Sequence, residues 1–306
     1  MKCSFCSKQS IYFRENEGHY FCENHFSESI EKKVRKNIRS NNLIGKKDKI
    51  AVALSGGKDS SSTLFLLKKI FKNNPNIEII AITIDQGFGC VNEYNAALAS
   101  GFCQEIGVKH HIFSFKQEFK KTFKELVRKN PKSSYCSICG VLRRYLINKK
   151  VRELGCTKLA TGHNLDDECQ SILMNVIKGD MMRLARTGAM PMMAKNPKFI
   201  PRIKPLFNIP ESEVLLFAKT NKIKFSGQSC PFAKFNSLRG ETEQYLNNLE
   251  KKSPGVKHSL LESALKLKPH VEKQFKKDKI KLCEKCKEPA SKKMCKTCEV
   301  LGGVLS

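Results

Sequence analysis

The sequence predicts an α/β fold with a doubly wound, mostly parallel sheet and a small metal-binding module at each end of the chain. The first observation is that short apolar runs alternate with amphipathic stretches of helical length between residues 50 and 225. The second is the run NIEIIAITI at residues 76–84, whose apolar character is typical of a parallel strand covered on both faces. The third is a set of CxxC pairs near both chain ends.

The composition favours a nucleic-acid partner. The 306-residue chain has 56 Lys and Arg against 29 Asp and Glu, a formal net charge of +27. Such an excess favours a polyanion, because each neutralised phosphate releases counterions, although a solvated lysine-rich surface is the simpler alternative. The sequence has no run of eighteen apolar residues, and no apolar leader follows Met1. It therefore predicts no membrane association and a cytoplasmic location.

Residues 1–27 have the pattern of a zinc module. With 14 cysteines and no secretory leader, the spacing indicates metal binding rather than disulfides. Each of two closely spaced pairs can wrap one ion, and together they complete a tetrahedron. His19 is a competing ligand that fits the paired spacing less well. The expected zinc ligands are Cys3, Cys6, Cys22 and His25.

Three further segments surround the expected catalytic domain. Residues 28–49 form a basic, helix-like linker that either lies on RNA phosphate or presents an ordinary solvated face. Residues 226–275 contain a loop around Cys230 and C-terminal helices. Residues 276–306 form a second zinc module with four thiolates. Its expected ligands are Cys283, Cys286, Cys295 and Cys298.

Residues 50–225 form the expected catalytic domain. Its predicted strands are 50–54, 76–84, 108–115 and 158–161. One predicted helix begins at Ser61. The other predicted helices are 92–107, 119–128, 140–154, 166–177 and 210–221. Residues 179–201 combine methionine and basic side chains without clean periodicity, so a flexible lid, an RNA-facing loop and a plain irregular loop all remain open.

The sequence SGGKDS after the first strand has the arrangement of an anion site. Glycines let the backbone turn tightly and approach a ligand, and the first N–H groups of the following helix are free to bind it. Lys58 adds a donor, and Asp59 can hold Mg²⁺ against phosphates. The spacing is not a Walker A loop but resembles the PP-loop of ATP pyrophosphatases. The alternative is an ordinary Gly-Gly turn.

The sequence GHNLDDE follows the fourth strand. Strand ends of a doubly wound sheet share one edge, so this segment and the SGGKDS loop are expected to face one crevice. Gly162 and His163 let the backbone approach a nucleotide, and Asp166 and Asp167 either bind Mg²⁺ or cap the next helix.

A third cysteine set consists of Cys136, Cys139 and the distant Cys230. Three thiolates without a fourth nearby ligand suit an iron–sulfur cluster that leaves one iron open. A redox CxxC and a third zinc site completed by another residue are the alternatives.

The motifs are together similar to those of the tRNA 2-thiouridine synthetases of the TtuA/NcsA type. The likeness runs over essentially the whole chain, through SGGKDS, CSICG with Arg143–Arg144, TGHNLDDE, RIKPL, the Cys-Pro-Phe at Cys230 and the zinc motifs. The resemblance implies a PP-loop ATPase fold of the adenine nucleotide alpha hydrolase kind. It implies an enzyme, a tRNA sulfurtransferase, in which ATP adenylates the C2 oxygen of a tRNA uridine, pyrophosphate leaves, and sulfur replaces that oxygen.

The resemblance also implies a [4Fe–4S] cluster on Cys136, Cys139 and Cys230, with a free iron that activates hydrosulfide. Asp59, Arg143 and the three cysteines are then catalytic. Inorganic sulfide or a thiocarboxylated ubiquitin-like protein would donate the sulfur, and a homodimer is expected. The TtuA-like members of the family, which act on U54, look to have a lysine at the position of Arg143. The arginine here therefore resembles the wobble-uridine enzymes and favours U34.

ATP is expected to contact residues of the loop, the two adjacent strands and the opposite wall. These are Ala53, Leu54, Ser55, Gly56, Gly57, Lys58, Asp59, Ser60, Ile82, Arg143, Gly162, Asp166 and Asp167. Two other functions remain open. Another PP-loop ATP pyrophosphatase, such as a tRNA lysidine synthetase, would not predict the three clustered cysteines, and a non-catalytic zinc-ribbon protein would leave SGGKDS and GHNLDD unexplained.

Overall fold

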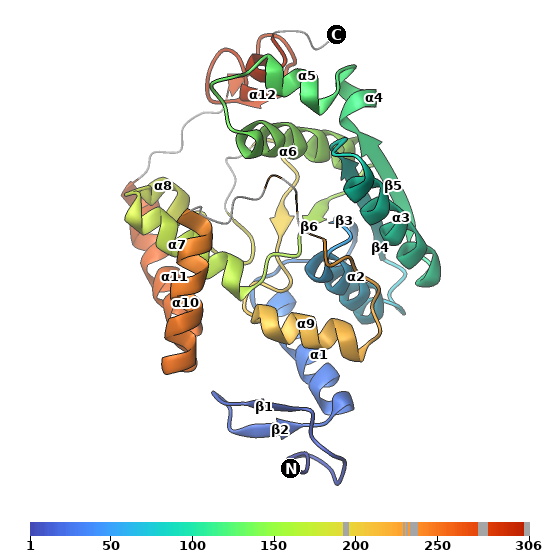
Figure 1. Cartoon of the computed structure of the whole chain (residues 1–306), viewed down its shortest axis with the longest axis vertical. Coiled ribbons are helices and arrows are strands. Elements are labelled where there is room, and N and C mark those ends of the chain that lie inside the picture. Colours follow the sequence, from blue (N-terminus) through green and yellow to red (C-terminus); the bar gives the residue numbers. More distant parts are fainter. Residues whose placement is uncertain (192–195, 229, 231, 233–237, 275–280, 303–306) are drawn as a thin grey trace.

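The computed structural model describes the chain except for residues 192–195, 229, 231, 233–237, 275–280 and 303–306 and the side chains of residues 90–92. At its centre lies a parallel five-stranded sheet in the order β5-β4-β3-β6-β7 (Figure 1). The strands are β3 (Asp48–Ala53), β4 (Ile77–Asp85), β5 (Lys109–Ser114), β6 (Lys158–Ala160) and β7 (Arg202–Ile203). The prediction of a doubly wound α/β fold is therefore confirmed.

Helices cover both faces of the sheet, and successive strand residues alternate between two cores. Ile50 and Val52 point into one core, while Ala51 belongs to the other. The first core contains side chains of α1 (Glu23–Ser40), α2 (Lys58–Ile70), α3 (Cys90–Glu105), α7 (Leu165–Ile177) and α9 (Glu211–Thr220). The second contains side chains of α4 (Phe115–Phe119), α5 (Phe123–Arg128) and α6 (Tyr135–Glu153).

The strand order places the functional crevice. From β3 the chain runs through α2 to β4 and then through α3 to β5 on one side, whereas β6 pairs with the other side of β3. This reversal between β3 and β6 is where ligands bind in open α/β sheets, outside the carboxyl ends of the strands. The SGGKDS loop follows β3 and GHNLDD follows β6, so both motifs border that point.

A helical layer packs beside this edge. It is formed by α8 (Met181–Leu184), α10 (Leu238–Lys252) and α11 (Val256–Gln274) against α7. No helix in the described ranges is both long enough and apolar enough to cross a bilayer.

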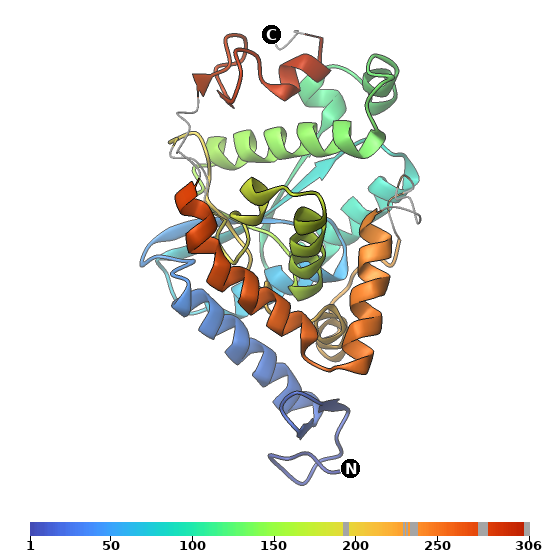
Figure 2. The same ribbon diagram turned by 90° about the vertical axis from the view of Figure 1, so that its left-hand side faces the viewer.

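The two terminal modules lie at opposite ends of the molecule (Figure 2). The N-terminal hairpin, β1 (Tyr12–Arg14) with β2 (His19–Phe21), is fixed to α9 by a buried ion pair. In that pair Arg14 Nε donates to Glu213 Oε1 at 2.7 Å, and each side chain is only 2% exposed. The C-terminal hairpin, β8 (Lys281–Leu282) with β9 (Pro289–Ala290), and α12 (Lys296–Val300) lie over α6.

Several boundaries differ from the expected ones. Helix α6 begins at Tyr135 rather than near residue 140, because Ser134 caps it by accepting the Ser137 N–H at 3.3 Å. The CxxC therefore lies on the first turn of the helix instead of before it. Helix α1 begins at Glu23 and runs across the expected boundary between residues 27 and 28. Within the segment 179–201 the structure has the short helix α8, and residues 192–195 lie outside the described part.

Candidate active site

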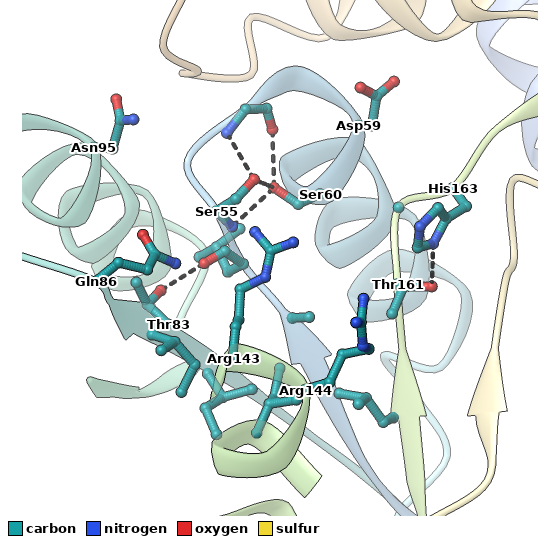
Figure 3. Close-up of a pocket in the computed structure, with 18 of the residues that line it drawn as sticks. Ser55, Asp59, Ser60, Thr83, Gln86, Asn95, Arg143, Arg144, Thr161 and His163 are labelled. Carbon is teal, nitrogen blue, oxygen red and sulfur yellow. Dashed lines mark hydrogen bonds between the residues drawn. The ribbon is translucent and has the colours of Figure 1, made fainter. Parts of the chain in front are cut away.

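The SGGKDS loop forms a cradle of backbone donors at the start of α2. The Ser60 hydroxyl donates to the Gly57 carbonyl at 3.0 Å and accepts the Ser55 N–H at 3.1 Å, which closes the loop (Figure 3). Gly57 is the N-cap of α2, and no side chain caps the helix. The first N–H groups of α2 are therefore available to an anion, and the helix dipole favours one there.

Two glycines are required by close backbone contacts. Gly56 has φ +82°, and a Cβ there would lie 2.8 Å from the carbonyl oxygen of Asn95. Gly162, just beyond β6, packs on the start of α2, where its Cβ would lie 2.7 Å from the Ser60 backbone nitrogen. The two motif loops thus touch backbone to backbone, which only glycine permits.

A pocket of about 910 Å³ opens beside this cradle. The expected ATP contacts that line it are Ala53, Leu54, Ser55, Gly57, Asp59, Ser60, Ile82, Arg143, Gly162 and Asp167. Gly56, within the same loop, is buried and does not line the pocket. Lys58 does not line the pocket; its Nζ pairs with Glu211 at 2.5 Å and with Asp59 at 3.1 Å. Asp166 is buried, pairs with Lys257 and accepts the Glu211 N–H at 2.7 Å, so it ties α7 to α9 and α11.

Two carboxylates face the pocket from opposite motifs. Asp59 accepts from Asn164 Nδ2 at 3.1 Å, and burial raises the pKa of its carboxyl despite the charge on Lys58. Burial likewise raises the pKa of Asp167, although Arg239 pairs with it at 2.5 Å. Both groups also line a small acidic recess with Glu211 and Glu243. Paired carboxylates of this kind are the oxygen ligands that Mg²⁺ prefers.

The three motif cysteines converge on the same side of the pocket. Cys139 and Cys230 line it, and Cys136 lies against the Phe232 carbonyl at 3.8 Å. Their sulfurs do not form a group within 4.8 Å among the described residues. One tetrahedral zinc, with Zn–S bonds of about 2.3 Å, would need a tighter group than this. An iron–sulfur cluster spreads its ligands over several irons, so the wider spacing fits it.

Cys139, Cys230 and the cradle formed by the SGGKDS loop share one cavity. The loop before Cys230 is anchored to the cradle, because the Ser226 N–H donates to the Gly56 carbonyl at 2.8 Å. Arg143, one helical turn after Cys139 on α6, points toward Ser55 and Ser60 (Figure 3). Burial raises the pKa of Cys139, while the positive charge of Arg143 opposes that shift.

Comparison with known proteins supports this combination of sites. The PP-loop domain family model matches residues 25–230. The tRNA-5-methyluridine(54) 2-sulfurtransferase of Pyrococcus horikoshii is 35% identical, over 99% of this chain and 94% of its own. Cytoplasmic tRNA 2-thiolation protein 1 of Caenorhabditis briggsae is 31% identical, over 98% of this chain and 79% of its own. The chain belongs to the PP-loop tRNA 2-thiolation proteins.

A solved structure extends the likeness to the whole molecule. The U34-tRNA thiolase NcsA from Methanococcus maripaludis, determined with its [4Fe–4S] cluster, aligns with this chain at a TM-score of 0.87 and 36% identity. The alignment covers 100% of this chain and 98% of that one. The resemblance inferred from the motifs is therefore confirmed for both family and fold.

In this tRNA 2-thiolation protein the terminal modules bring their predicted ligands together. All four ligand atoms of each module lie within 4.8 Å of one another, and His25 rather than His19 completes the N-terminal set. Cys6 and Cys22 lie 3.7 Å apart, and Cys283 and Cys298 lie 3.8 Å apart. These separations match the edge of a tetrahedron with Zn–S bonds of about 2.3 Å.

Several pocket residues of the 2-thiolation protein were not among the expected ATP contacts. They are Thr83, Asp85, Gln86, Phe88, Asn95, Arg144, Thr161, His163, Arg186, Arg202 and Lys204. Two of them could have been found from the sequence, because they are charged residues at the limits of strands: Asp85 ends β4 and Arg202 begins β7. Arg186 and Asn95 carried no such signal, because they reach the pocket from segments without a motif.

Proposed function

We propose that this protein replaces the C2 oxygen of a tRNA uridine with sulfur, and that the uridine is U34 at the wobble position. The observation that carries the proposal is the shared cavity, in which an ATP-type phosphate cradle lies together with Cys139 and Cys230, while Cys136 lies on the same helical turn as Cys139. The family relation and the U34-tRNA thiolase with a TM-score of 0.87 support the substrate class.

The chemistry requires the C2 oxygen to become a leaving group. The oxygen attacks the α-phosphorus of ATP, pyrophosphate departs, and hydrosulfide then displaces AMP from C2. In this scheme the backbone N–H groups of residues 55–60 hold the phosphates, and Arg143 counters the charge that develops on them. Ala53 and Ile82 would support the adenosine part of ATP, and Asp59 and Asp167 would hold Mg²⁺.

The donor set of Cys136, Cys139 and Cys230 suits a [4Fe–4S] cluster, because the three thiols are near enough for Cys136 and Cys230 to act electrostatically on Cys139, and Cys139 and Cys230 lie beside the cradle. When bound, that cluster supplies the sulfur-handling chemistry of the reaction. The protein itself contributes the enclosure, because Cys230 arrives on a loop held to the cradle by Ser226.

The remaining partners follow from the same proposal. Each terminal module would hold one Zn²⁺ on its four grouped ligands. Lys58 and Asp166 would support the cradle from behind rather than touch ATP, since both are engaged in ion pairs. We also propose a cytoplasmic enzyme that acts as a homodimer and takes sulfur from inorganic sulfide or a thiocarboxylated ubiquitin-like protein.

A second candidate is thiolation at position 54. It is favoured by the relative from Pyrococcus horikoshii, a tRNA-5-methyluridine(54) 2-sulfurtransferase with 35% identity. The arginine at position 143 and the match to a U34-tRNA thiolase favour position 34.

One experiment tests both candidates. The protein is purified without oxygen, its iron and acid-labile sulfide are measured, and it is incubated with tRNA, ATP, Mg²⁺ and sulfide. We expect AMP and pyrophosphate to form and 2-thiouridine to map to U34 by mass spectrometry of tRNA digests. Thiouridine at position 54 would overturn only the choice of uridine, whereas no thiouridine from cluster-loaded protein would overturn the proposed function.

A further inference from the structure

Four arginines line the active-site pocket. Arg143 and Arg144 come from α6, Arg186 follows α8, and Arg202 begins β7. Other cations at the pocket are neutralised, since Lys204 pairs with Glu168 at 2.6 Å. Among the described residues no ion pair joins any of the four arginines to a carboxylate, although Asp59, Asp85 and Asp167 line the same pocket.

This arrangement is electrostatically unfavourable without a ligand. Burial lowers the pKa of Arg144, and the charges of Arg143 and Arg183 lower it further. Burial also lowers the pKa of Arg202, together with the charges of Arg144 and Arg143. The Nε of Arg202 is buried and has no hydrogen-bond partner. Like charges and an unpaired buried donor both favour binding of an anion that pairs with them.

The ATP phosphates already have a separate place. They have the backbone donors of the cradle, toward which Arg143 points (Figure 3). Arg144 lies on the other side of Arg143, between it and the wall of Thr161 and His163 (Figure 3). Its guanidinium lies along the backbone at Gly140, where a Cβ would approach Arg144 Nη1 to 3.3 Å. Arg144 and Arg202 therefore belong to a second group of anion donors.

The positive charge continues from the pocket to its rim. Arg186 is exposed. Arg183, whose side chain is 68% exposed, pairs with Asp180 at 3.2 Å and still acts electrostatically on Arg144. A single small anion would use only part of such a row. A chain of phosphodiesters that enters the pocket with one nucleotide inside would use all of it, because neighbouring phosphates repeat along the strand.

We propose that Arg144, Arg186 and Arg202 form a phosphodiester subsite that holds the RNA backbone next to the target uridine. This inference rests on the proposed function and adds the part of the substrate that it leaves undefined. Each contact would be a charge-assisted hydrogen bond to phosphate, for which the planar guanidinium is well suited. The subsite would set the depth of the uridine and thereby place its C2 oxygen at the cradle.

The test uses the holoenzyme and an anticodon stem-loop RNA in which one phosphate beside the uridine is a neutral methylphosphonate. Each of the two flanking positions is replaced in turn, and binding is measured for the wild type, Arg144→Gln and Arg202→Gln. Arg128→Gln is the matched control, since Arg128 is exposed on α5 away from the pocket. Zinc content and circular dichroism show that each variant is folded.

We expect the Arg144→Gln and Arg202→Gln changes to weaken binding of unmodified RNA about tenfold and to lower the salt slope by about one phosphate. At one of the two positions the neutral linkage should cost the wild type and Arg128→Gln about tenfold but cost Arg144→Gln nothing further, because the same contact is already lost. Affinity for ATP should stay within about twofold of the wild type.

Other outcomes overturn the subsite. If Arg144→Gln weakens ATP or pyrophosphate binding and leaves RNA binding intact, the arginines serve the nucleotide. If Arg144→Gln still binds each methylphosphonate RNA about tenfold more weakly than unmodified RNA, the substitution acts through general electrostatics rather than through a local contact. If the wild type thiolates tRNA but the variants bind RNA normally, only the subsite fails. If the wild type neither binds nor thiolates tRNA, the proposed function fails with it.

Discussion

Cys230 is the one member of the three-cysteine set that lies outside α6, so it gives the cleanest single-residue test of the sulfur centre. It is exposed at the pocket, whereas Cys136 and Cys139 share a helical turn. We predict that Cys230→Ser reduces thiolation at least about 100-fold, because a cluster ligand is lost. Iron and acid-labile sulfide should fall, while zinc content stays that of the wild type.

Cys156 is the matched control for this substitution. It is only 4% exposed, packs in the core on the α6 side of the sheet, and has no ligand partner. Cys156→Ala should keep its iron and most of its activity. Full activity of Cys230→Ser with undiminished iron would contradict the three-cysteine cluster.

His163 gives a prediction about pH. Although His163 is exposed along the pocket, desolvation by the surrounding protein, reinforced by the charge of Lys204, lowers the pKa of its imidazole to about 4, so we expect a neutral ring at physiological pH. Its Nδ1 lies 2.8 Å from the Thr161 hydroxyl, which fixes the ring against the pocket wall. We predict that His163→Gln stays within about threefold of wild-type activity at pH 7 and leaves the shape of the rate profile between pH 5.5 and 8 unchanged.

The expected pH dependence of the activity follows from the direction in which the pKa of His163 is shifted. A histidine titrating near its ordinary pKa would gain charge below pH 6.5 and produce an acidic limb, whereas His163 gains its proton only near pH 4. An acidic limb near pH 6.5 that disappears in His163→Gln would show that the imidazole titrates normally and would contradict this prediction.

At the scale of elements, the contact between the end of β6 and the start of α2 holds the two motif loops in register. A Cβ on residue 162 would come within 2.7 Å of the Asp59 carbonyl carbon as well as of the Ser60 nitrogen. These are backbone atoms, so the loops must separate to admit it. We predict that Gly162→Ala lowers ATP affinity at least about tenfold by displacing the first N–H groups of α2.

Gly101 on α3 provides the control for the added methyl group. A Cβ at this position meets no atom within 4 Å, and its φ is not positive. Gly101→Ala should therefore bind ATP normally and gain about 0.5–1 kcal/mol of stability from the lower entropy of its unfolded chain. Isothermal titration of ATP with both variants would make the comparison, and normal ATP binding by Gly162→Ala would contradict the packing argument.

The strands and motif loops were predictable because their signals are local. The central strands β3 and β4 contain the apolar runs 50–53 and 79–82, and the SGGKDS loop has to lie at a strand end to bind phosphate. The start of α6 was predicted too late, at residue 140, since the side chain of Ser134 caps the helix and the CxxC lies in its first turn. A side-chain hydroxyl decided that boundary, and apolar periodicity does not report it.

The roles of charged residues were harder to predict because they depend on distant partners. Lys58 and Asp166 belong to motifs, yet each is held by a residue from another part of the chain, Glu211 and Lys257 respectively. The arginines of the pocket likewise come from three separate segments. Arg143 and Arg144 follow the CSICG motif and Arg202 begins RIKPL, whereas Arg186 stood in no recognisable motif. Long-range pairing of this kind follows from the tertiary fold and leaves no periodic trace in the sequence.

Across the whole molecule, the C-terminal module packs against α6, the helix on which Cys136, Cys139 and Arg143 lie. Arg152 of α6 pairs with Glu288 beside the module's hairpin, and Asn130 donates to the Val300 carbonyl of α12 at 2.9 Å. The buried side chains of Val300 and Leu301 belong to the same core as Leu142 of α6. Loss of the module's metal should therefore loosen α6, which holds Cys136, Cys139 and Arg143.

We predict that Cys298→Ser removes one zinc, reduces the iron content, and lowers thiolation at least about tenfold, although Cys298 does not line the pocket. Cys6→Ser should also remove one zinc but leave the iron content unchanged, because the N-terminal module packs on α1 and α9 at the opposite end of the molecule. Metal analysis of both variants, purified without oxygen, measures this difference. Equal iron retention in the two variants would show that the C-terminal module does not support the sulfur centre, and α6 would then be held in place by its core contacts alone.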